Sequence, residues 1–305
     1  MEDSAEHTSV YRAFPGCRVL ERAGLGGGLS ANASLWRLQL ADGSEARVVM
    51  RRPTWQTHAE TVAALKVEQR ALQLARAAGV SAPKPHTVDD ACAALLLEFV
   101  PGAPEFGTPL SADSVEQIAR VLAQIHSVRG DQYDLSFLPQ LFESVRRKLR
   151  EPPETLDLDL AEDRIRAALL RSFPSGQANP DVLLHGDYWP GNWLWEHGQL
   201  AAAIDWEEAQ AGDPLADVAI TRLDILWAFG EAAMHAFTRE YAALTPWSWN
   251  QLPIWDLVAA LRPMSNLERW AAIYPKAPIH RPDVNAAHMR HWHRWFVDRA
   301  LAELA

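Results

Sequence analysis

The chain has 305 residues, of which 48% are hydrophobic and 22% charged, as is ordinary for a globular protein that forms one large domain or two lobes. Its formal net charge of -10 disfavours nucleic acid as a partner, because binding to a phosphate backbone requires basic patches. No apolar stretch approaches the roughly 20 residues that a membrane-spanning helix needs.

The composition of residues 1–6 and the use of cysteine favour a cytoplasmic location. Residues 1–6 contain neither the basic nor the apolar segment of a secretory signal. Cys17 and Cys92 lie in apolar surroundings, and we expect them to be buried free thiols in a reducing compartment. We therefore expect a soluble cytoplasmic protein without a membrane or nucleic-acid partner. The sequence gives no indication of its oligomeric state.

The first hundred residues predict a small lobe rich in β-structure. Strands are expected at residues 17–23, 34–40, 45–51, 86–88 and 94–99, and a helix at 61–78. Apolar and polar residues alternate along the second strand, and the turn-forming residues 41–44 favour an antiparallel hairpin with the third. Gly79 follows the helix and is a typical helix stop.

Beyond residue 102 the apolar periodicity becomes helical. Helices are expected at residues 114–126, 138–150, 161–172, 214–230, 231–244, 254–274 and 285–304. Pro101 and Gly102 interrupt the pattern of strands, so we place a lobe boundary between residues 1–99 and residues 100–305. The fold class expected from these elements is α+β.

The most informative segment of the chain is HGDYWPGN, residues 185–192. It places Asp187 five residues ahead of Asn192, with a proline and a glycine between them that favour a loop. An apolar run a short distance further on ends at Asp205. An aspartate that can meet a hydroxyl group, together with an asparagine and an aspartate able to hold Mg²⁺, is what phosphoryl transfer from a nucleotide requires.

The order and spacing of these residues resemble the protein kinase pattern, in which H-R-D-x-x-x-x-N is followed by D-F-G. Gly186 replaces the arginine and Trp206 the phenylalanine, and with these departures the chain resembles the aminoglycoside phosphotransferase and choline kinase-like family. The resemblance implies a protein-kinase-like bilobal fold. Residues 1–99 would form a nucleotide-binding lobe with a small antiparallel sheet and one helix, and residues 100–305 a larger, mainly helical lobe for catalysis and substrate binding.

A glycine-rich segment lies between the first two expected strands. Gly26, Gly27, Gly28 and Ser30 could cradle a triphosphate, because glycines allow close approach and backbone N–H groups donate to phosphate oxygens. No Lys-Ser/Thr pair follows, so the segment is not a Walker A loop. It is similar to the phosphate loop of aminoglycoside phosphotransferase-like kinases, and a flexible hairpin loop is the alternative.

The resemblance implies further nucleotide contacts. Arg51, at the end of the third strand, matches the lysine that usually reaches the α- and β-phosphates, and Glu68 is its expected partner unless it is a solvated helix residue. Arginine keeps its charge and can bind phosphate through two N–H groups, so the substitution is chemically workable. Glu98 and Val100 lie in a segment that resembles the hinge that clasps an adenine through backbone groups, which does not distinguish ATP from GTP.

The catalytic roles follow from the same motifs. Asp187 is our candidate for the residue that orients the acceptor hydroxyl and accepts its proton. Asn192 and Asp205 would hold Mg²⁺ through oxygen atoms, as this hard cation prefers. We expect His185 to brace the loop by hydrogen bonds, and the resemblance implies that Asp217 supports the loop from the start of a helix.

The acceptor end is marked less clearly. Of thirteen tryptophans, eleven lie from Trp189 onward, and we expect most of them in the core. Trp189 is the expected exception, since it lies inside the catalytic loop and could hold a cationic or sugar-like acceptor. Glu207 either faces the substrate or is simply exposed. Asp224, Asp256 and Glu268 could add acidic groups.

We predict a small-molecule kinase that uses Mg²⁺ and transfers the γ-phosphate of ATP, or of GTP, to the hydroxyl group of an aminoglycoside-like antibiotic or a small metabolite. A non-catalytic, pseudokinase-like nucleotide-binding protein is the alternative, favoured if Arg51 fails to support productive ATP binding. The intact set of Asp187, Asn192 and Asp205 argues against it. A metal-dependent hydrolase using His185 would need a second histidine ligand, and none stands at a recognisable spacing.

Overall fold

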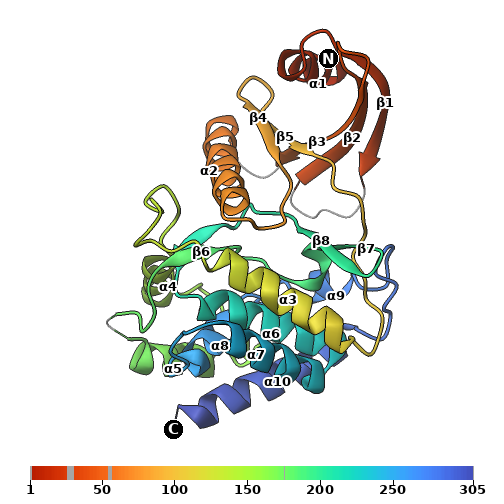
Figure 1. Cartoon of the computed structure of the whole chain (residues 1–305). Coiled ribbons are helices and arrows are strands. Elements are labelled where there is room, and N and C mark those ends of the chain that lie inside the picture. The colour runs from red at the N-terminus through yellow and green to blue at the C-terminus, as the bar shows by residue number, and fades with distance from the viewer. Residues whose placement is uncertain (1, 26–30, 54–56, 175, 305) are drawn as a thin grey trace.

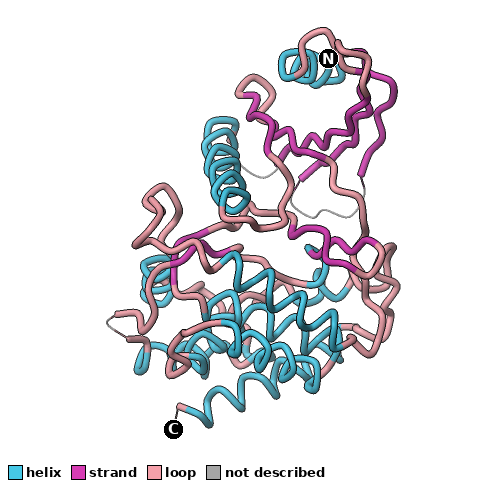
Figure 2. The backbone as a smooth tube through the Cα atoms, viewed as in Figure 1, coloured by secondary structure: helices cyan, strands magenta, loops and turns pink. Residues whose placement is uncertain are grey.

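The structure, a computed structural model, describes residues 2–25, 31–53, 57–174 and 176–304, and it confirms the predicted α+β architecture. A small lobe built on one sheet stands above a larger, mainly helical lobe (Figure 1, Figure 2). The sheet is antiparallel, with strand order β1-β2-β3-β5-β4. Its strands are β1 (Arg18–Leu25), β2 (Ala31–Gln39), β3 (Glu45–Pro53), β4 (Pro85–Asp89) and β5 (Ala94–Glu98).

The hairpin between β2 and β3 forms where turn chemistry predicts it. Ser44 N–H donates to Asp42 Oδ1 at 2.9 Å, and Leu40 N–H donates to Ser44 O at 2.7 Å. Gly43 adopts a φ of 86°, which a residue without a Cβ reaches at little cost. The hairpin sets the register of β3 and so fixes which face of the sheet Arg51 occupies.

Helix α2 (His58–Ala77) packs beside the sheet and begins three residues before the predicted start. Thr57 and Glu60 form a reciprocal capping box at its first turn, which satisfies backbone donors that the helix itself leaves unpaired. Gly79, with a φ of 86°, follows its last turn. The buried face of α2 carries Leu65, Leu72 and the charged Glu68.

Helix α1 (Glu2–Ala13) is an element that the sequence patterns did not predict. Val10 is fully buried in the small-lobe core with Trp36. Ion pairs fix the helix to the sheet, since Arg12 Nη1 lies 2.6 Å from Asp89 Oδ2 and Arg52 Nη1 lies 2.9 Å from Glu6 Oε1.

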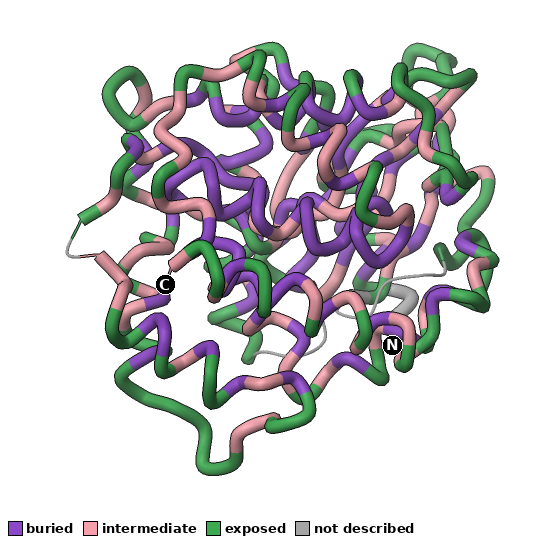
Figure 3. Tube along the Cα trace, turned by 90° about the horizontal axis from the view of Figure 1, so that it is seen from below, coloured by how far each residue is buried: buried purple, intermediate pink, exposed green. Residues whose placement is uncertain are grey.

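The large lobe is built around α6 (Leu215–Phe229), which is buried along almost its whole length and packs against α7 and α8. Figure 3 shows buried positions concentrated inside this lobe, with exposed segments around them. The other helices are α3 (Ala112–Ile125), α4 (Leu141–Arg150), α5 (Glu162–Ser172), α7 (Glu231–Leu244), α8 (Leu252–Ala260), α9 (Leu267–Ala271) and α10 (Ala286–Glu303). Within the described ranges, no helix is long and apolar enough to cross a membrane.

Two short strand pairs hold the motif loops. β6 (Val182–Leu184) pairs with β9 (Gln210–Gly212), and β7 (Trp193–Glu196) pairs with β8 (Gln199–Ala203). The loop from β6 to β7 and the loop from β8 to β9 therefore both run between these two strand pairs. This pairing brings residues 185–192 next to residues 204–209.

The prediction of one continuous helix at 254–274 was wrong in the middle of this range. The chain leaves the α-helix after Ala260 and re-enters one at Leu267. Pro263 accounts for the break, because proline lacks the N–H that continues a helix and clashes with the preceding turn. The intervening turn carries Arg262 into the predicted site.

The chain crosses between the lobes beside β7. Ala103 and Trp195 exchange backbone hydrogen bonds of 3.1 Å and 2.9 Å. At Gly102 a Cβ would lie 2.7 Å from Trp195 O, and the φ of 123° is also one that favours glycine. The lobe boundary between residues 99 and 100 stays a prediction. Both cysteines are free, with Cys92 buried and Cys17 half-buried.

Candidate active site

Asp187 and Asn192 contact each other directly across the loop between β6 and β7. Asn192 Nδ2 donates to Asp187 Oδ2 at 3.1 Å and to the Asp187 carbonyl oxygen at 2.9 Å. Because the amide nitrogen is turned toward Asp187, Asn192 Oδ1 points away and is left as an acceptor. Ile204 N–H donates to Asn192 O at 2.9 Å, so the residue before Asp205 is tied to the same loop.

Two glycines allow the tight course of this loop. Gly186 has a φ of 80°, and a Cβ there would lie 2.0 Å from Glu208 O. At Gly191 a Cβ would lie 2.1 Å from a ring carbon of Trp189. The chain of Glu208 and the indole of Trp189 therefore occupy the volume that side chains at these two positions would need.

His185 is fully buried and joins the two motif loops. Its Nε2 lies 3.0 Å from Ile204 O, and Asp187 N–H donates to its Nδ1 at 3.3 Å. The pattern is that of a neutral imidazole with the proton on Nε2, since a carbonyl oxygen only accepts. Burial lowers the pKa of His185, which favours the same neutral form. These contacts hold the two motif loops together. The supporting role of His185 stays a prediction.

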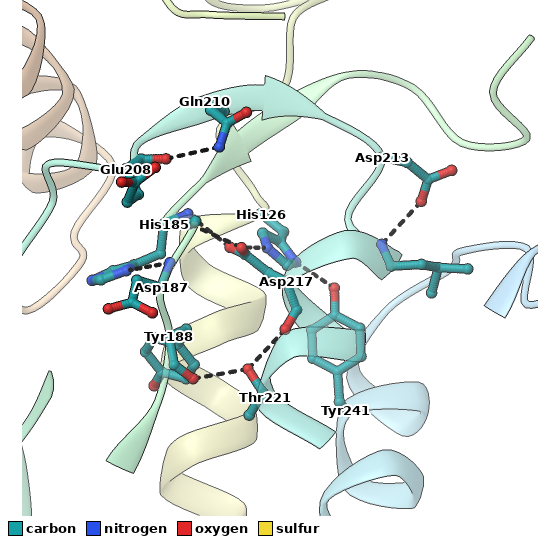
Figure 4. A network of polar contacts seen from close by, with 12 residues as sticks. His126, His185, Asp187, Tyr188, Glu208, Gln210, Asp213, Asp217, Thr221 and Tyr241 are labelled. Carbon is teal, nitrogen blue, oxygen red and sulfur yellow. Dashed lines mark hydrogen bonds and ion pairs between the residues drawn. The ribbon is translucent and has the colours of Figure 1, made fainter. Parts of the chain in front are cut away.

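Asp217, in the first turn of α6, holds the start of the loop from below (Figure 4). Its Oδ2 accepts from His185 N–H at 2.7 Å and its Oδ1 from Gly186 N–H at 2.9 Å. His126 Nε2 lies 3.2 Å from Oδ2, and His126 Nδ1 lies 2.6 Å from the hydroxyl of Tyr241. Burial alone would raise the pKa of Asp217, but the hydrogen bond from His126 and the neighbouring donors hold it below its usual range.

Arg51 lies at the centre of a cluster of carboxylates. Its Nη1 donates to Glu68 Oε2 at 2.6 Å, which is the ion pair that the sequence predicts. Its Nη2 lies 3.1 Å from Asp205 Oδ1 and also donates to Glu207. The Arg51 side chain is only 9% exposed. Although burial opposes its charge, the surrounding carboxylates raise the pKa of Arg51. The guanidinium therefore links β3, α2 and the loop after β8.

Asp205 carries the features of a cation ligand. It has a φ of 65°, and aspartate is one of the few residues that tolerate this region. Its Oδ1 is buried and lacks a hydrogen bond among the residues that the structure describes; Arg51 Nη2 is close enough, but not aligned to donate. Burial raises the pKa of Asp205, the charge of Arg51 lowers it, and the charge of Glu207 raises it again. A bound cation would relieve both the repulsion and the unpaired oxygen.

The donor set fits Mg²⁺. Asn192 Oδ1 and the carboxylates of Asp205 and Glu207 are hard oxygen donors, which this cation prefers. Nitrogen and sulfur ligands of the kind that hold zinc do not contribute to this set. Among the described residues, no group of three or more His, Cys, Asp or Glu side chains is arranged to hold a metal.

The nucleotide end is described in part. Gly26, Gly27, Gly28 and Ser30 lie outside the described residues. At the hinge, Glu98 N–H donates to Lys84 O at 2.8 Å and Phe99 N–H donates to Arg47 O at 3.1 Å. Within the described ranges the N–H of Val100 makes no hydrogen bond, and it is half-buried. The exposed Glu98 side chain points to a backbone role for this residue.

The acceptor side contains Arg262, a residue that the sequence analysis missed. Arg262 Nη2 donates to Asp187 Oδ1, and its Nη1 lies 3.4 Å from Asp224 Oδ2. Asp224, on α6, is almost fully buried, and burial raises its pKa to about 7 against the opposing charge of Arg262. Pro263 was the available signal, since a proline inside an expected helix ends that helix at the preceding residue.

The other two candidate acidic residues lie elsewhere. Asp256 is buried and forms two hydrogen bonds of 3.1 Å and 3.0 Å with Arg222. Glu268 is exposed and paired with Arg290. Glu207 contacts Arg51 and so lies on the nucleotide side of Asp205.

Aromatic rings line the segment next to Asp187. Trp189 is half-buried, and its ring centroid lies 6.3 Å from that of Phe106 and 6.4 Å from that of Tyr274. Phe229 stacks on Phe106 at 6.0 Å. Trp206, by contrast, is buried, and its Nε1 donates to Ala203 O at 3.0 Å. Trp189 therefore differs from the other motif tryptophans in keeping part of its ring accessible.

One cavity of about 370 Å³ lies away from these residues, between α10 and the start of α5. Its lining is mixed in charge, with Asp159, Asp163 and Asp298 beside Arg164 and Arg294. None of the predicted site residues lines it. We therefore assign the site by the side chains around Asp187.

The profile of the phosphotransferase enzyme family matches residues 25–253 of the chain. No curated protein sequence matches it significantly. Solved structures do match over nearly the full length. A macrolide 2'-phosphotransferase, MphH from Brachybacterium faecium, is 20% identical with a TM-score of 0.61, covering 94% of this chain and 98% of that one.

Two kinases match comparably well. Choline kinase LicA from Streptococcus pneumoniae is 16% identical with a TM-score of 0.61, and the match covers 99% of this chain and 98% of the kinase. Amicoumacin kinase hAmiN, solved with AMP-PNP, Ca²⁺ and Ami, is 13% identical with a TM-score of 0.61, covering 98% and 96%. Likeness at these identities shows the fold, and it confirms the predicted protein-kinase-like architecture.

Proposed function

Because the chain belongs to the phosphotransferase enzyme family, we propose that it transfers the γ-phosphate of ATP to a hydroxyl group of a small molecule, an aminoglycoside-like antibiotic or a metabolite. The observation that carries this proposal is the contact between Asp187 and Asn192, with Asp205 tied to the same loop and to Arg51. A proton acceptor, oxygen donors for a cation and a phosphate-binding cation thus lie within one group of contacting residues.

In the proposed reaction, the acceptor oxygen forms a bond to the γ-phosphorus as the bond from that phosphorus to the β,γ-bridging oxygen breaks. The hydroxyl proton passes to Asp187, whose Oδ2 is oriented by Asn192. Asn192, Asp205 and Glu207 would hold Mg²⁺, which neutralises charge on the phosphate oxygens when bound. Amicoumacin kinase hAmiN, which shares the fold, binds AMP-PNP and Ca²⁺ in its solved structure, and this supports the same kind of site here.

Arg51 would bind the α- and β-phosphates, and Glu68 would hold it in position from α2. The guanidinium presents a planar set of donors, so it can bind two phosphate oxygens at once. The adenine would meet the N–H of Val100, which makes no hydrogen bond within the described ranges, and the carbonyl oxygen of Glu98. Gly26, Gly27, Gly28 and Ser30 would contact the phosphates. We propose residues 1–99 as the nucleotide-binding lobe and 100–305 as the catalytic lobe on the same grounds.

The test is nucleotide consumption with Mg-ATP, and with Mg-GTP in parallel, against aminoglycosides, choline-like alcohols, hydroxy amino acids and sugars. Turnover with one acceptor that is lost in Asp187→Asn would support the proposal and name the substrate class. Calorimetry on the same samples measures Mg-ATP binding separately. A chain that binds Mg-ATP but phosphorylates nothing in a broad panel, with wild type and Asp187→Asn indistinguishable, would favour the non-catalytic alternative.

A further inference from the structure

A positive charge already occupies the acceptor side of Asp187. The Arg262 guanidinium donates to Asp187 through Nη2 and approaches Asp224 to 3.4 Å through Nη1. Its central carbon also lies 5.6 Å from the ring centroid of Trp270. The Arg262 side chain is 26% exposed, so it is partly accessible to a ligand beside Asp187. These contacts are the ones that an ammonium group of an acceptor would otherwise make.

The carboxylates around Arg262 leave little surplus negative charge for a second cation. Asp187 and Asp224 share the one guanidinium, and burial keeps Asp224 partly protonated near neutral pH by raising its pKa to about 7. Glu208 is an exposed residue, so solvent and salt weaken its attraction for a cation.

A cationic acceptor would have two ways to reach Asp187, and both are unfavourable. If it bound beside Arg262, two like charges would lie close together in a partly buried site. If it displaced Arg262, the guanidinium would lose Asp187, Asp224 and the face of Trp270 together. An uncharged hydroxyl compound meets neither obstacle, because Arg262 stays in place and can donate to it.

The neighbouring surface suits an uncharged body. Trp189 is half-buried and keeps part of its ring accessible next to Asp187. Phe106 and Tyr274 are buried behind it, with ring centroids 6.3 Å and 6.4 Å from that of Trp189. Such rings bury apolar or sugar-like surfaces without requiring a charge.

We propose that Arg262 supplies the positive charge of the acceptor site from within the chain. Of the acceptors named above, this leaves uncharged hydroxyl compounds and excludes aminoglycosides and other alcohols that bear an ammonium group. The inference rests on the proposed function, because it takes the side of Asp187 opposite Asn192 as the place of the acceptor. It assigns Arg262 as a specificity-determining residue and Asp224 as the residue that keeps it there.

Matched pairs of compounds that differ by one charge test the inference. The first pair is choline and its uncharged carbon isostere, 3,3-dimethyl-1-butanol. The second pair is glucosamine and glucose. Dissociation constants are measured by calorimetry in the presence of Mg²⁺ and a non-hydrolysable ATP analogue. We expect wild type to prefer the neutral member of at least one pair by about tenfold or more. Arg262→Met should lower that preference by at least about tenfold, because it removes the competing charge.

Two variants control for charge and folding. Arg262→Lys keeps the positive charge and should retain the preference for neutral compounds. Arg294→Met removes one positive charge from an exposed residue of α10 and should behave as wild type. Cooperative thermal unfolding of each variant checks that it is folded.

The inference is overturned if wild type binds the cationic member of each pair as tightly as the neutral one. It is also overturned if Arg262→Met leaves the ratios unchanged, which includes no measurable binding of any of the four compounds to either protein. Binding of the Mg-nucleotide, recorded in the same titrations, separates this failure from that of the proposed function. If the nucleotide itself does not bind, the proposed function fails first.

Discussion

The predicted site contains two arginines in contact with carboxylates, and they are held in different ways. Arg51 stands on a central strand, is 9% exposed and contacts Glu68, Asp205 and Glu207. Arg262 stands in a turn between two helices, is 26% exposed and contacts Asp187 and Asp224. Three carboxylates share Arg51 and two share Arg262, so the surplus of acidic groups is larger around Arg51.

This difference teaches which end of the site is built to receive a cation. On the Arg51 side a carboxylate oxygen of Asp205 lacks a hydrogen bond among the described residues, and additional positive charge would be stabilising. On the Arg262 side one guanidinium already contacts both carboxylates. The proposed metal on one side and the proposed uncharged acceptor on the other would complement these charges.

The largest effect is expected from Asp187→Asn, which removes the proposed proton acceptor. The amide cannot accept the hydroxyl proton, so turnover should fall by about 10²–10⁴-fold. Affinity for Mg-ATP should stay within about twofold, because the amide oxygen can still accept the hydrogen bond from Asn192, the proposed Mg²⁺ ligand. Steady-state kinetics and calorimetry measure the two quantities. Parallel loss of nucleotide affinity would show that the two sides are not separable.

Stability should separate the two arginines. Arg51→Met leaves three carboxylates without their common cation and should lower the free energy of unfolding by about 3 kcal/mol. Arg262→Met should cost about 1 kcal/mol, because its contacts are more exposed. Urea denaturation of both variants gives the comparison. Equal losses would contradict the ranking by burial and charge.

Asp224 should make stability depend on pH. Its pKa is about 7 in the folded chain against an ordinary value of 3.8, so between these values the folded state binds more protons than the unfolded state. The free energy of unfolding therefore falls as pH rises through this range. Asp224→Asn removes the contribution, and from pH 5 to pH 8 we expect wild type to lose about 2 kcal/mol more than the variant. Parallel pH profiles in urea would refute this.

The smallest effect concerns the loop on the acceptor side. Gly191→Ala would place a Cβ 2.1 Å from the Trp189 ring, and because that ring is only half-buried it can shift at a cost of about 1 kcal/mol. In a Trp189→Ala background the same substitution should be nearly neutral. Thermal unfolding of the four proteins in this double-mutant cycle measures the coupling. Purely additive effects would place the clash elsewhere.

The parts of the site that could be predicted are local in sequence. Asp187 and Asn192 lie within one turn of chain, and Arg51 and Glu68 lie on successive elements of the small lobe. Spacing and element order suffice for such pairs. Most helix and strand bounds could also be predicted from the sequence. They follow from the periodicity of apolar residues and from glycine and proline residues that end the elements.

The parts that were missed depend on tertiary packing. Arg262 meets Asp187 across 75 residues of sequence, and its turn exists because Pro263 interrupts an otherwise continuous apolar pattern. The sequence named Asp224 as a candidate acidic residue but could not place it in the site. The structure places it beside Arg262, because α6 lies against that turn. Helix α1 has a weak apolar face and is held largely by ion pairs to strands far along the chain, such as that of Arg12 with Asp89.

Arg51 also bridges the two lobes, because it belongs to β3 while Asp205 and Glu207 belong to the large lobe. These ion pairs add to other contacts between the lobes, such as the hydrogen bond of 2.9 Å from Ala203 N–H to Ser81 O. A nucleotide whose phosphates bind the Arg51 guanidinium, as proposed, would have to break these ion pairs and replace them by its own contacts to both lobes. Its affinity would then be the difference between the free energies of two sets of contacts.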